Sequence, residues 1–261
     1  LMEWALITVV FGLIYGSFLN VLILRFDDLA SLITKPSHCP TCQARLKWYE
    51  LVPIFSFLLL RARCRSCLKP ISWQYPVVEL FSAVLVTLGY QHFILLADQP
   101  IWREVAALVA FLLIIACLMV IFFHDLYEMA IPDLAVNWLI ALAAIFFLLR
   151  GGSPTDLTFG AIVGFLPIAL IVYPSRGRWM GEGDVKLSAA LGLMLGWPLA
   201  AVGLVAAFMI GGLFGLIAIT AQLVKPRSAV PFGPFLIVGG LIALFFGSQL
   251  LDWYLLSIGY Y

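Results

Sequence analysis

The sequence predicts an all-α polytopic membrane protein with about eight transmembrane helices and a zinc-ribbon-like loop between the first two. Of its 261 residues, 64% are hydrophobic and 11% are charged, and the mean hydropathy is +1.08. Soluble domains carry about 25% charged residues. The apolar residues fall in runs of about 20, the length at which a helix crosses a bilayer. This composition excludes an ordinary soluble protein, and the formal net charge of +1 indicates no particular partner.

The apolar runs predict the helices in chain order. The first run, 4–24, follows no basic residue and ends without a small-residue cleavage site, so we expect a retained helix rather than a signal peptide. The stretch 185–224 is long enough to cross twice, with a break either at Gly196-Trp197-Pro198 or at the Gly211-Gly212 pair. The other helices are expected near 77–97, 104–124, 131–149, 156–173 and 230–250.

Basic residues predict the orientation, because cytoplasmic loops carry an excess of lysine and arginine. The loop 26–75 holds seven of the fifteen: Lys35, Arg45, Lys47, Arg61, Arg63, Arg65 and Lys69. We therefore expect this loop in the cytoplasm and the N-terminus outside, and alternation places 125–133 and 174–186 in the cytoplasm too. Lys225 and Arg227 lie on the cytoplasmic side only if the stretch 185–224 crosses the membrane twice. This favours eight spans with both termini outside.

The loop contains two Cys-x-x-Cys motifs, formed by Cys39 with Cys42 and by Cys64 with Cys67. Four thiolates at this spacing suit tetrahedral Zn²⁺, with two disulfides as the alternative. A reducing cytoplasmic loop favours the metal. Because four protein ligands leave no position for a catalytic water, we predict a structural zinc site. Cys117 lies within an apolar run and is predicted to be a buried apolar residue.

Two aspartates lie at the ends of apolar runs, Asp125 in FHDLYEMAIPD and Asp184 in GEGDVKLSAALG. A carboxylate beside a membrane span is costly unless it has a partner, a wet cavity or a function. Both are predicted on the cytoplasmic side, where they can meet and share a proton, which is the arrangement for aspartyl peptide-bond hydrolysis. Gly181 and Gly183 would allow a tight turn and the close approach of a substrate chain.

Three alternatives to catalysis remain from the residues alone. The aspartates could cap helices, as Asp133 after a proline is expected to do. A transporter could use them to carry protons or cations, but it would place them near mid-span and show a repeat of broken helices. A zinc-bearing scaffold without catalysis would tolerate Asp184→Asn.

Six ordered segments resemble the motifs of the bacterial type IV prepilin peptidases, which belong to the GxGD class of membrane aspartyl proteases. The resemblance covers nearly the whole chain. The segments are GSFLNVLILR at 16–25, the cysteine pairs SHCPTC at 37–42 and RCRSC at 63–67, ISWQYPVVEL at 71–80, HDLYEMAIPD at 124–133, GEGDVKL at 181–187 and PFGPFL at 231–236.

The resemblance implies a bifunctional enzyme of the bacterial inner membrane with a cytoplasmic active site. Such an enzyme removes the basic leader from type IV prepilins or type II secretion pseudopilins and then N-methylates the new terminal residue from S-adenosylmethionine. The catalytic pair falls on Asp125 and Asp184. The supporting motif positions are Gly181, Gly183, Lys186 and Asp133, of which Asp133 matches a non-catalytic aspartate.

Methyl transfer is associated in the family with the first cytoplasmic loop, which here implies Gly16, Asn20, Glu79 and the cysteines. No glycine-rich nucleotide loop is visible, so the donor site cannot be placed by motif, and a peptidase without methyltransferase activity is an open alternative. The domains implied are a first transmembrane helix (1–25), a four-cysteine zinc loop (26–75) and a transmembrane peptidase domain (76–261).

Prepilin or pseudopilin substrates and the lipid bilayer are the expected partners, with no nucleic acid; the sequence indicates no oligomeric state. The acidic side chains of Glu128 and Glu182 are candidates to attract a basic leader. His124 precedes Asp125, but neighbours on a helix point about 100° apart, so we expect a bystander.

Overall fold

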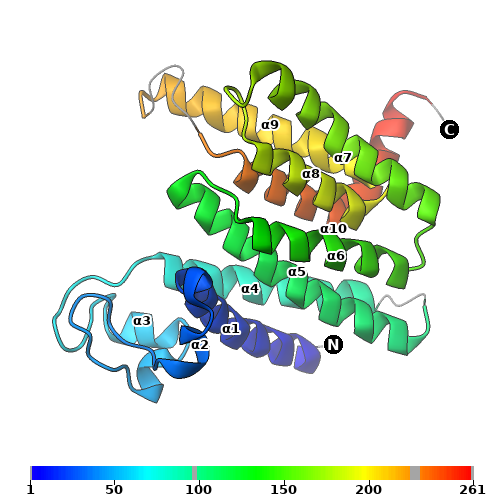
Figure 1. The fold of residues 1–261 in the computed structure, drawn as a ribbon. Coiled ribbons are helices and arrows are strands. Elements are labelled where there is room, and N and C mark those ends of the chain that lie inside the picture. The colour runs from blue at the N-terminus through cyan, green and yellow to red at the C-terminus, as the bar shows by residue number, and fades with distance from the viewer. Residues whose placement is uncertain (1, 96–98, 224–229, 260–261) are drawn as a thin grey trace. The chain divides into compact units, whose positions relative to one another are not determined.

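The computed structural model describes residues 2–95, 99–223 and 230–259 and is helical throughout these ranges, apart from loops and two isolated β-bridges. The chain divides into two compact units, Leu1–Leu96 and Ala97–Tyr261. Figure 1 shows the order of the helices along the chain. The all-α fold class is therefore confirmed, and each unit is described by itself.

Unit 1 is built on two long helices, α1 (Met2–Leu24) and α4 (Gln74–Tyr90), which pack along each other. A π-helical turn, η3 (Gln91–Leu95), follows α4. Two glycines of α1 make this contact close: a Cβ on Gly12 would lie 2.5 Å from Ala83 Cα, and one on Gly16 would lie 2.6 Å from Glu79 Cα. Small residues let membrane helices approach backbone to backbone, so these positions exclude larger side chains.

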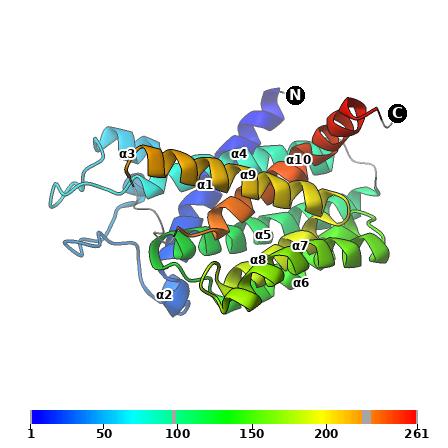
Figure 2. The ribbon, with the colours of Figure 1, turned by 90° about the horizontal axis from the view of Figure 1, so that it is seen from above.

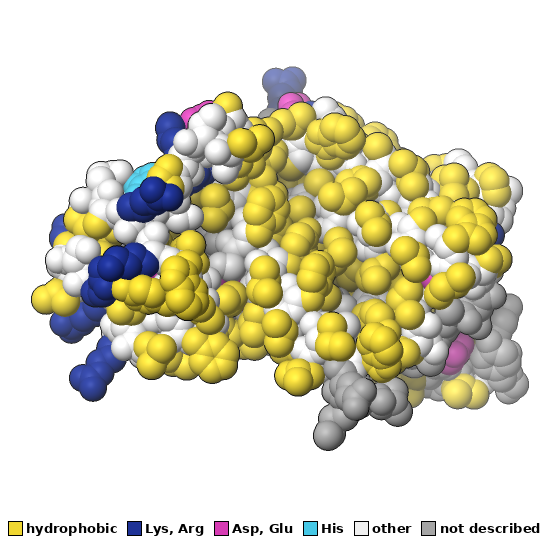
Figure 3. Space-filling model, turned by 90° about the horizontal axis from the view of Figure 1, so that it is seen from below, with side chains coloured by type: hydrophobic (Ala, Val, Ile, Leu, Met, Phe, Trp, Pro, Cys, Tyr) yellow, Lys and Arg dark blue, Asp and Glu magenta, His cyan; other side chains and the backbone are white. Residues whose placement is uncertain are grey.

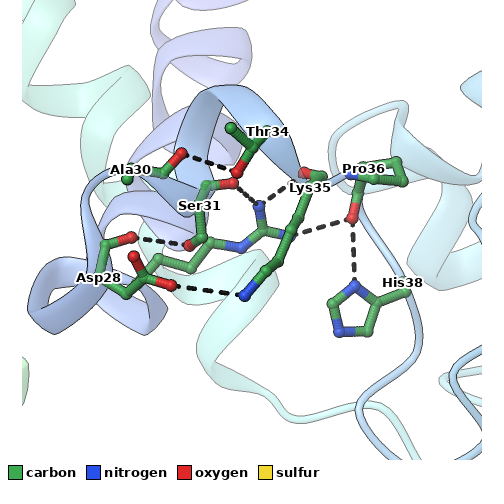
Figure 4. Close-up of polar contacts among 8 residues, drawn as sticks. Asp28, Ala30, Ser31, Thr34, Lys35, Pro36 and His38 are labelled. Carbon is green, nitrogen blue, oxygen red and sulfur yellow. Dashed lines mark hydrogen bonds and ion pairs between the residues drawn. The ribbon is translucent and has the colours of Figure 1, made fainter.

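Four short helices interrupt the polar loop of unit 1: η1 (Phe26–Asp28), α2 (Ser31–Thr34), η2 (Trp48–Leu51) and α3 (Phe55–Leu59). Arg25, at the end of α1, organises the first of these turns. Its guanidinium donates to the carbonyl oxygens of Ser31 and Lys35, both at 2.7 Å, and of Pro36 at 3.1 Å (Figure 4). A single basic side chain thus fixes the path by which the loop leaves the membrane helix.

The loop carries seven of the chain's fifteen lysines and arginines. In Figure 3, lysine and arginine side chains gather at the left, and hydrophobic side chains cover most of the remaining face. Such a hydrophobic surface is expected where helices face lipid. The chain is a multi-pass membrane protein.

The described part of unit 2 contains six helices, and α5 and α6 pack on each other before the chain turns to α7 and α8. Figure 2 shows these helices from above, with α7 and α8 side by side. Contacts of α10 with α5, α8 and α9 complete the bundle. The bounds are α5 (Ile101–Glu128), α6 (Asp133–Leu149), α7 (Pro154–Ser175), α8 (Glu182–Leu195), α9 (Leu199–Thr220) and α10 (Gly233–Ser257).

Two kinds of contact hold this bundle. Phe111 of α5 is fully buried, and its ring contacts those of Phe146 of α6 and Phe245 of α10 at centroid distances of 6.2 and 5.8 Å. Between α7 and α8 the contact is backbone to backbone, since a Cβ on Gly192 would lie 2.2 Å from the carbonyl oxygen of Gly160. These helices therefore cross at a small-residue interface.

A buried ion pair closes the end of α5 away from Asp125. Glu104 is 2% exposed and lies 3.3 Å from Arg150, which follows α6. Arg103 donates to the carbonyl oxygen of Leu148 at 2.7 Å. Arg103 and Arg150 are thus both tied to this junction of α5 and α6.

The predicted helices are found, with corrections at their ends. The stretch 185–224 breaks at Gly196-Trp197-Pro198, the first of the two sites considered. Helix α5 runs to Glu128 rather than 124, because Met129 closes it in a left-handed conformation with φ 52°. Among the described residues six helices are long and apolar enough to cross a membrane, and α6 and α8 are shorter, with 17 and 14 residues. Lys225 and Arg227 lie outside the described residues.

Candidate active site and metal centre

Asp125 lies in the last turn of α5 and is 5% exposed. Its Oδ2 accepts a hydrogen bond from the backbone N–H of Gly233, the first residue of α10, at 2.9 Å. An N–H at a helix N-terminus stabilises a negative charge. Two helices that are distant in sequence therefore meet at this carboxylate.

Asp184 lies in the first turn of α8 and is 7% exposed. Its Oδ2 accepts the N–H of Gly181, the residue that precedes the helix, at 3.1 Å. Its buried Oδ1 has no hydrogen-bond partner among the described residues. Because a buried carboxylate oxygen is costly to leave unpaired, this atom is suited to bind a water or a substrate group.

The two carboxyl groups are close enough to interact electrostatically. Burial in an apolar surrounding and mutual repulsion both oppose full ionisation of such a pair. One shared proton leaves one carboxylate able to accept a proton and one carboxylic acid able to donate one. Peptide-bond hydrolysis requires both a base that accepts a proton and an acid that donates one.

The turn between α5 and α6 lies against the start of α8. A Cβ on Gly183 would lie 2.8 Å from Cβ of Ile131, so glycine is needed for this contact. Lys186 of α8 donates to Asp133 of α6 at 2.6 Å. The prediction that Asp133 caps a helix is wrong: Pro132 occupies the N-cap position, and the Asp133 side chain makes no capping bond.

The remaining polar residues near the pair are placed as follows. His124 is partly buried, and its Nδ1 lies 3.0 Å from the carbonyl oxygen of Val120 on its own helix. Glu128 and Glu182 are exposed, at the end of α5 and the start of α8. Their predicted attraction for a basic leader stays a prediction.

The four loop cysteines form a single cluster in unit 1. All four Sγ atoms lie within 4.8 Å of one another, and none is in a disulfide. The distances are 3.9 Å from Cys39 to Cys67 and 4.0 Å from Cys42 to Cys64. Four sulfurs at tetrahedral positions around a metal at about 2.3 Å would lie about 3.8 Å apart, so the cluster fits a metal ion.

The backbone around the cysteines forms two matching knuckles. The N–H of Cys39 donates to Ala44 and the N–H of Cys64 to Lys69, at 2.9 and 2.8 Å. The Cys42 N–H lowers the pKa of the Cys39 thiol to about 6, which favours a thiolate at this position, whereas burial and the neighbouring sulfurs raise the pKa of the Cys42 thiol to about 11. The cluster could therefore hold a metal through four sulfur ligands.

Unit 1 also contains a cavity of about 380 Å³, within the size range of small-molecule sites. Glu79, 6% exposed, lines it and accepts the N–H of Ile54 from the loop at 2.7 Å. Close by on α1, Asn20 is 1% exposed and donates to the carbonyl oxygens of Gly16 and Tyr75. Of the residues predicted for methyl transfer, Gly16, Asn20 and Glu79 share the α1–α4 contact. The cavity lining includes Glu79 and two of the predicted cysteines, Cys39 and Cys64, but neither Gly16 nor Asn20.

Two groups of these sites were not predicted from the sequence, and both are backbone amides. Gly233 supplies its N–H to Asp125, and Ile54 supplies its N–H to Glu79 from a backbone conformation with φ 59° and ψ −51°. A β-branched residue rarely adopts this conformation, which indicates local strain. The sequence carries a signal only for the first of these amides, because Gly233 lies between Pro231 and Pro234 in PFGPFL.

Comparison with known proteins identifies the family of the chain. The family model described as "Type IV leader peptidase family" matches residues 112–216, and "Bacterial Peptidase A24 N-terminal domain" matches residues 10–93. A prepilin leader peptidase/N-methyltransferase of Aeromonas salmonicida is 32% identical over 278 residues, covering 95% of this chain and 92% of the relative. The chain belongs to the type IV leader peptidase family.

Other family members show similar coverage. The Bacillus subtilis prepilin leader peptidase/N-methyltransferase is 32% identical over 250 residues, covering 94% of this chain and 96% of the relative. The one from Legionella pneumophila is 31% identical over 289 residues, covering 98% and 95%. No solved structure matches the chain.

Proposed function

We propose that the protein is a membrane aspartyl endopeptidase that removes the basic leader of type IV prepilins or type II secretion pseudopilins and N-methylates the new N-terminal residue. The observation that carries the peptidase is the pair of buried carboxylates, Asp125 and Asp184, brought together from α5 and α8. The relatives named as prepilin leader peptidase/N-methyltransferase support both activities. Family membership does not favour the transporter alternative.

In the proposed reaction, the pair holds one proton. The ionised carboxylate takes a proton from a water, which attacks the carbonyl carbon of the scissile bond. The protonated carboxyl group hydrogen-bonds to the carbonyl oxygen, and a proton passes to the leaving amine as the C–N bond breaks. The unpaired Oδ1 of Asp184 is a suitable contact for the water or the carbonyl oxygen. The two aspartates titrate as a unit, so the acid and the base are assigned to the pair.

The proposed location is the bacterial inner membrane, with the active site on the cytoplasmic side. The basic loop of unit 1 supports this orientation through the positive-inside rule. The apolar helix of a substrate would enter between spans while its basic leader stays in the cytoplasm. Exposed Glu128 and Glu182 would attract that leader, an interaction that salt would weaken.

The metal proposed for the four cysteines is zinc in a structural role. Four sulfur ligands fill a tetrahedral sphere and leave no open position for chemistry. The loop has few buried side chains of its own, so a metal would hold the two knuckles together. Cys39, Cys42, Cys64 and Cys67 are the ligands in this proposal.

The proposed site for S-adenosylmethionine is the cavity of unit 1. The donor is a sulfonium that supplies an electrophilic methyl group. The buried carboxylate of Glu79, which lines this cavity, suits a cationic ligand. The volume of about 380 Å³ is sufficient for a ligand of this class.

The test is cleavage of a purified prepilin in detergent by the wild type, Asp125→Asn and Asp184→Asn, with product masses read with and without S-adenosylmethionine. We expect loss of the leader with the wild type alone, and a methyl increment that requires the donor. Cleavage that survives in both variants would contradict the peptidase site. Cleavage without any methyl increment would support a peptidase-only enzyme.

A further inference from the structure

The segment PFGPFL at 231–236 has no role in the reaction described above. It forms the start of α10, with Phe232 at the N-cap position and Gly233 as the first helical residue. Both residues lie in unit 2 together with Asp125 and Asp184. The contacts of this helix end decide what the segment does.

One backbone amide at this helix end is left for a partner outside the helix. Pro234 has no N–H. The N–H groups of Phe235 and Leu236 both donate to the carbonyl oxygen of Phe232, at 3.0 and 3.1 Å. The N–H of Gly233 is directed instead to Asp125 Oδ2 at 2.9 Å, in a buried contact.

The space around Gly233 matches this hydrogen bond. A Cβ at this position would lie 2.5 Å from Asp125 Oδ2 and 3.2 Å from Cγ. The backbone of Gly233 has no positive φ, so the conformation itself does not demand glycine. Glycine is needed because the carboxylate occupies the place of a side chain.

We propose that Gly233 is a positioning residue for the peptidase reaction: its N–H holds the Asp125 carboxylate in the orientation in which it shares a water-activating site with Asp184. The inference rests on the proposed peptidase function. A carboxylate at the end of a helix can rotate about its side-chain bonds, and small displacements of a catalytic group cost large factors in rate. The start of α10 would therefore be a third part of the site, beside α5 and α8.

Two variants test this role. Gly233→Ala displaces the carboxylate by adding one methyl group. Replacing Gly233 by glycolic acid converts the amide to an ester, which removes the N–H and adds no side chain. The matched control is Gly212→Ala in α9, where a Cβ would meet no atom within 4 Å.

We expect kcat for prepilin cleavage to fall about tenfold to a hundredfold in both Gly233 variants, with KM within about twofold, because a charge-assisted hydrogen bond is lost and substrate contacts are not. Methyl transfer to an already cleaved pilin peptide and the unfolding midpoint in detergent should match the wild type. Gly212→Ala should match it in every measurement.

Wild-type kcat in the ester variant would overturn the role of Gly233, whatever the alanine variant does. An equal loss of cleavage and methyl transfer would also overturn it, because that pattern indicates general unfolding. A wild type that fails to cleave any prepilin would overturn the proposed function and this inference together, so the two failures are distinguishable.

Discussion

Both units hold buried carboxylates through backbone amides, but these amides belong to different kinds of structure. In unit 2, Asp125 and Asp184 are fixed by backbone amides at the starts of helices, inside a packed bundle. In unit 1, Glu79 is fixed by Ile54, which belongs to a polar loop with a four-cysteine cluster. One site therefore depends on helix packing and the other on a folded loop, so the two proposed activities should be separable.

The largest expected effect is on cleavage alone. Asp184→Asn removes a charge at nearly constant volume, and we expect cleavage to fall by about 10⁴-fold, as when one member of a catalytic unit is lost. Methyl transfer to a pilin peptide that lacks its leader should stay within about twofold. Mass spectrometry of both products measures this, with Asp252→Asn, an exposed position near the end of α10, as the control. Parallel loss of cleavage and methyl transfer would contradict the claim that the two activities depend on separate sites.

Metal removal should affect the loop of unit 1. A structural metal contributes its binding energy to folding, so Cys64→Ser should lose the bound metal, and proteolysis should cut the loop 26–75 at least about tenfold faster. Metal content by elemental analysis and limited proteolysis measure both effects. Cys117→Ser, in α5, is the control because that residue is not in the cluster. A wild type that carries no metal would contradict the zinc proposal.

Substitution of Glu79 should have the opposite pattern, a loss of methyl transfer with cleavage kept. In Glu79→Gln the buried charge is lost while the shape is kept, and we expect methyl transfer to fall about tenfold to a hundredfold. Cleavage should change by less than about twofold. Titration of S-adenosylmethionine binding by calorimetry separates a loss of affinity from a loss of rate. Unchanged binding and transfer would remove Glu79 from the donor site.

Overpacking should lower the stability of unit 2. Gly192→Ala places a Cβ 2.2 Å from the carbonyl oxygen of Gly160, and we expect a destabilisation of about 1–3 kcal/mol. The unfolding midpoint in detergent measures it, and Gly215→Ala, which would meet no atom within 4 Å, is the control. Equal midpoints for the two variants would contradict the close contact of α7 with α8.

The smallest expected effect concerns the ion pair between Asp133 and Lys186. Their side chains are 70% and 46% exposed, and exposed pairs contribute little. We expect Asp133→Asn to change cleavage by about threefold or less, with recovery in the exchanged pair Asp133→Lys with Lys186→Asp. A loss as large as that of Asp184→Asn would mean that Asp133 takes part in the reaction.

Sequence patterns predicted the features that depend on residue type. The break at Gly196-Trp197-Pro198 follows from helix-breaking residues, and the cysteine cluster follows from its spacing. The partner of Asp133 was missed because Lys186 lies 53 residues away and only the fold brings them together. Gly233 was missed as a hydrogen-bond donor because every residue except proline has a backbone N–H, and its direction depends on tertiary structure.

The most direct test of a shared carboxylate site is a double-mutant cycle of prepilin cleavage with Asp125→Asn, Asp184→Asn and the double variant. If the two groups act as one unit, each single variant should lose nearly all of the rate, and the double variant should be no slower than the slower single variant. Losses that multiply in the double variant would mean that the carboxylates act independently. That result would contradict the account.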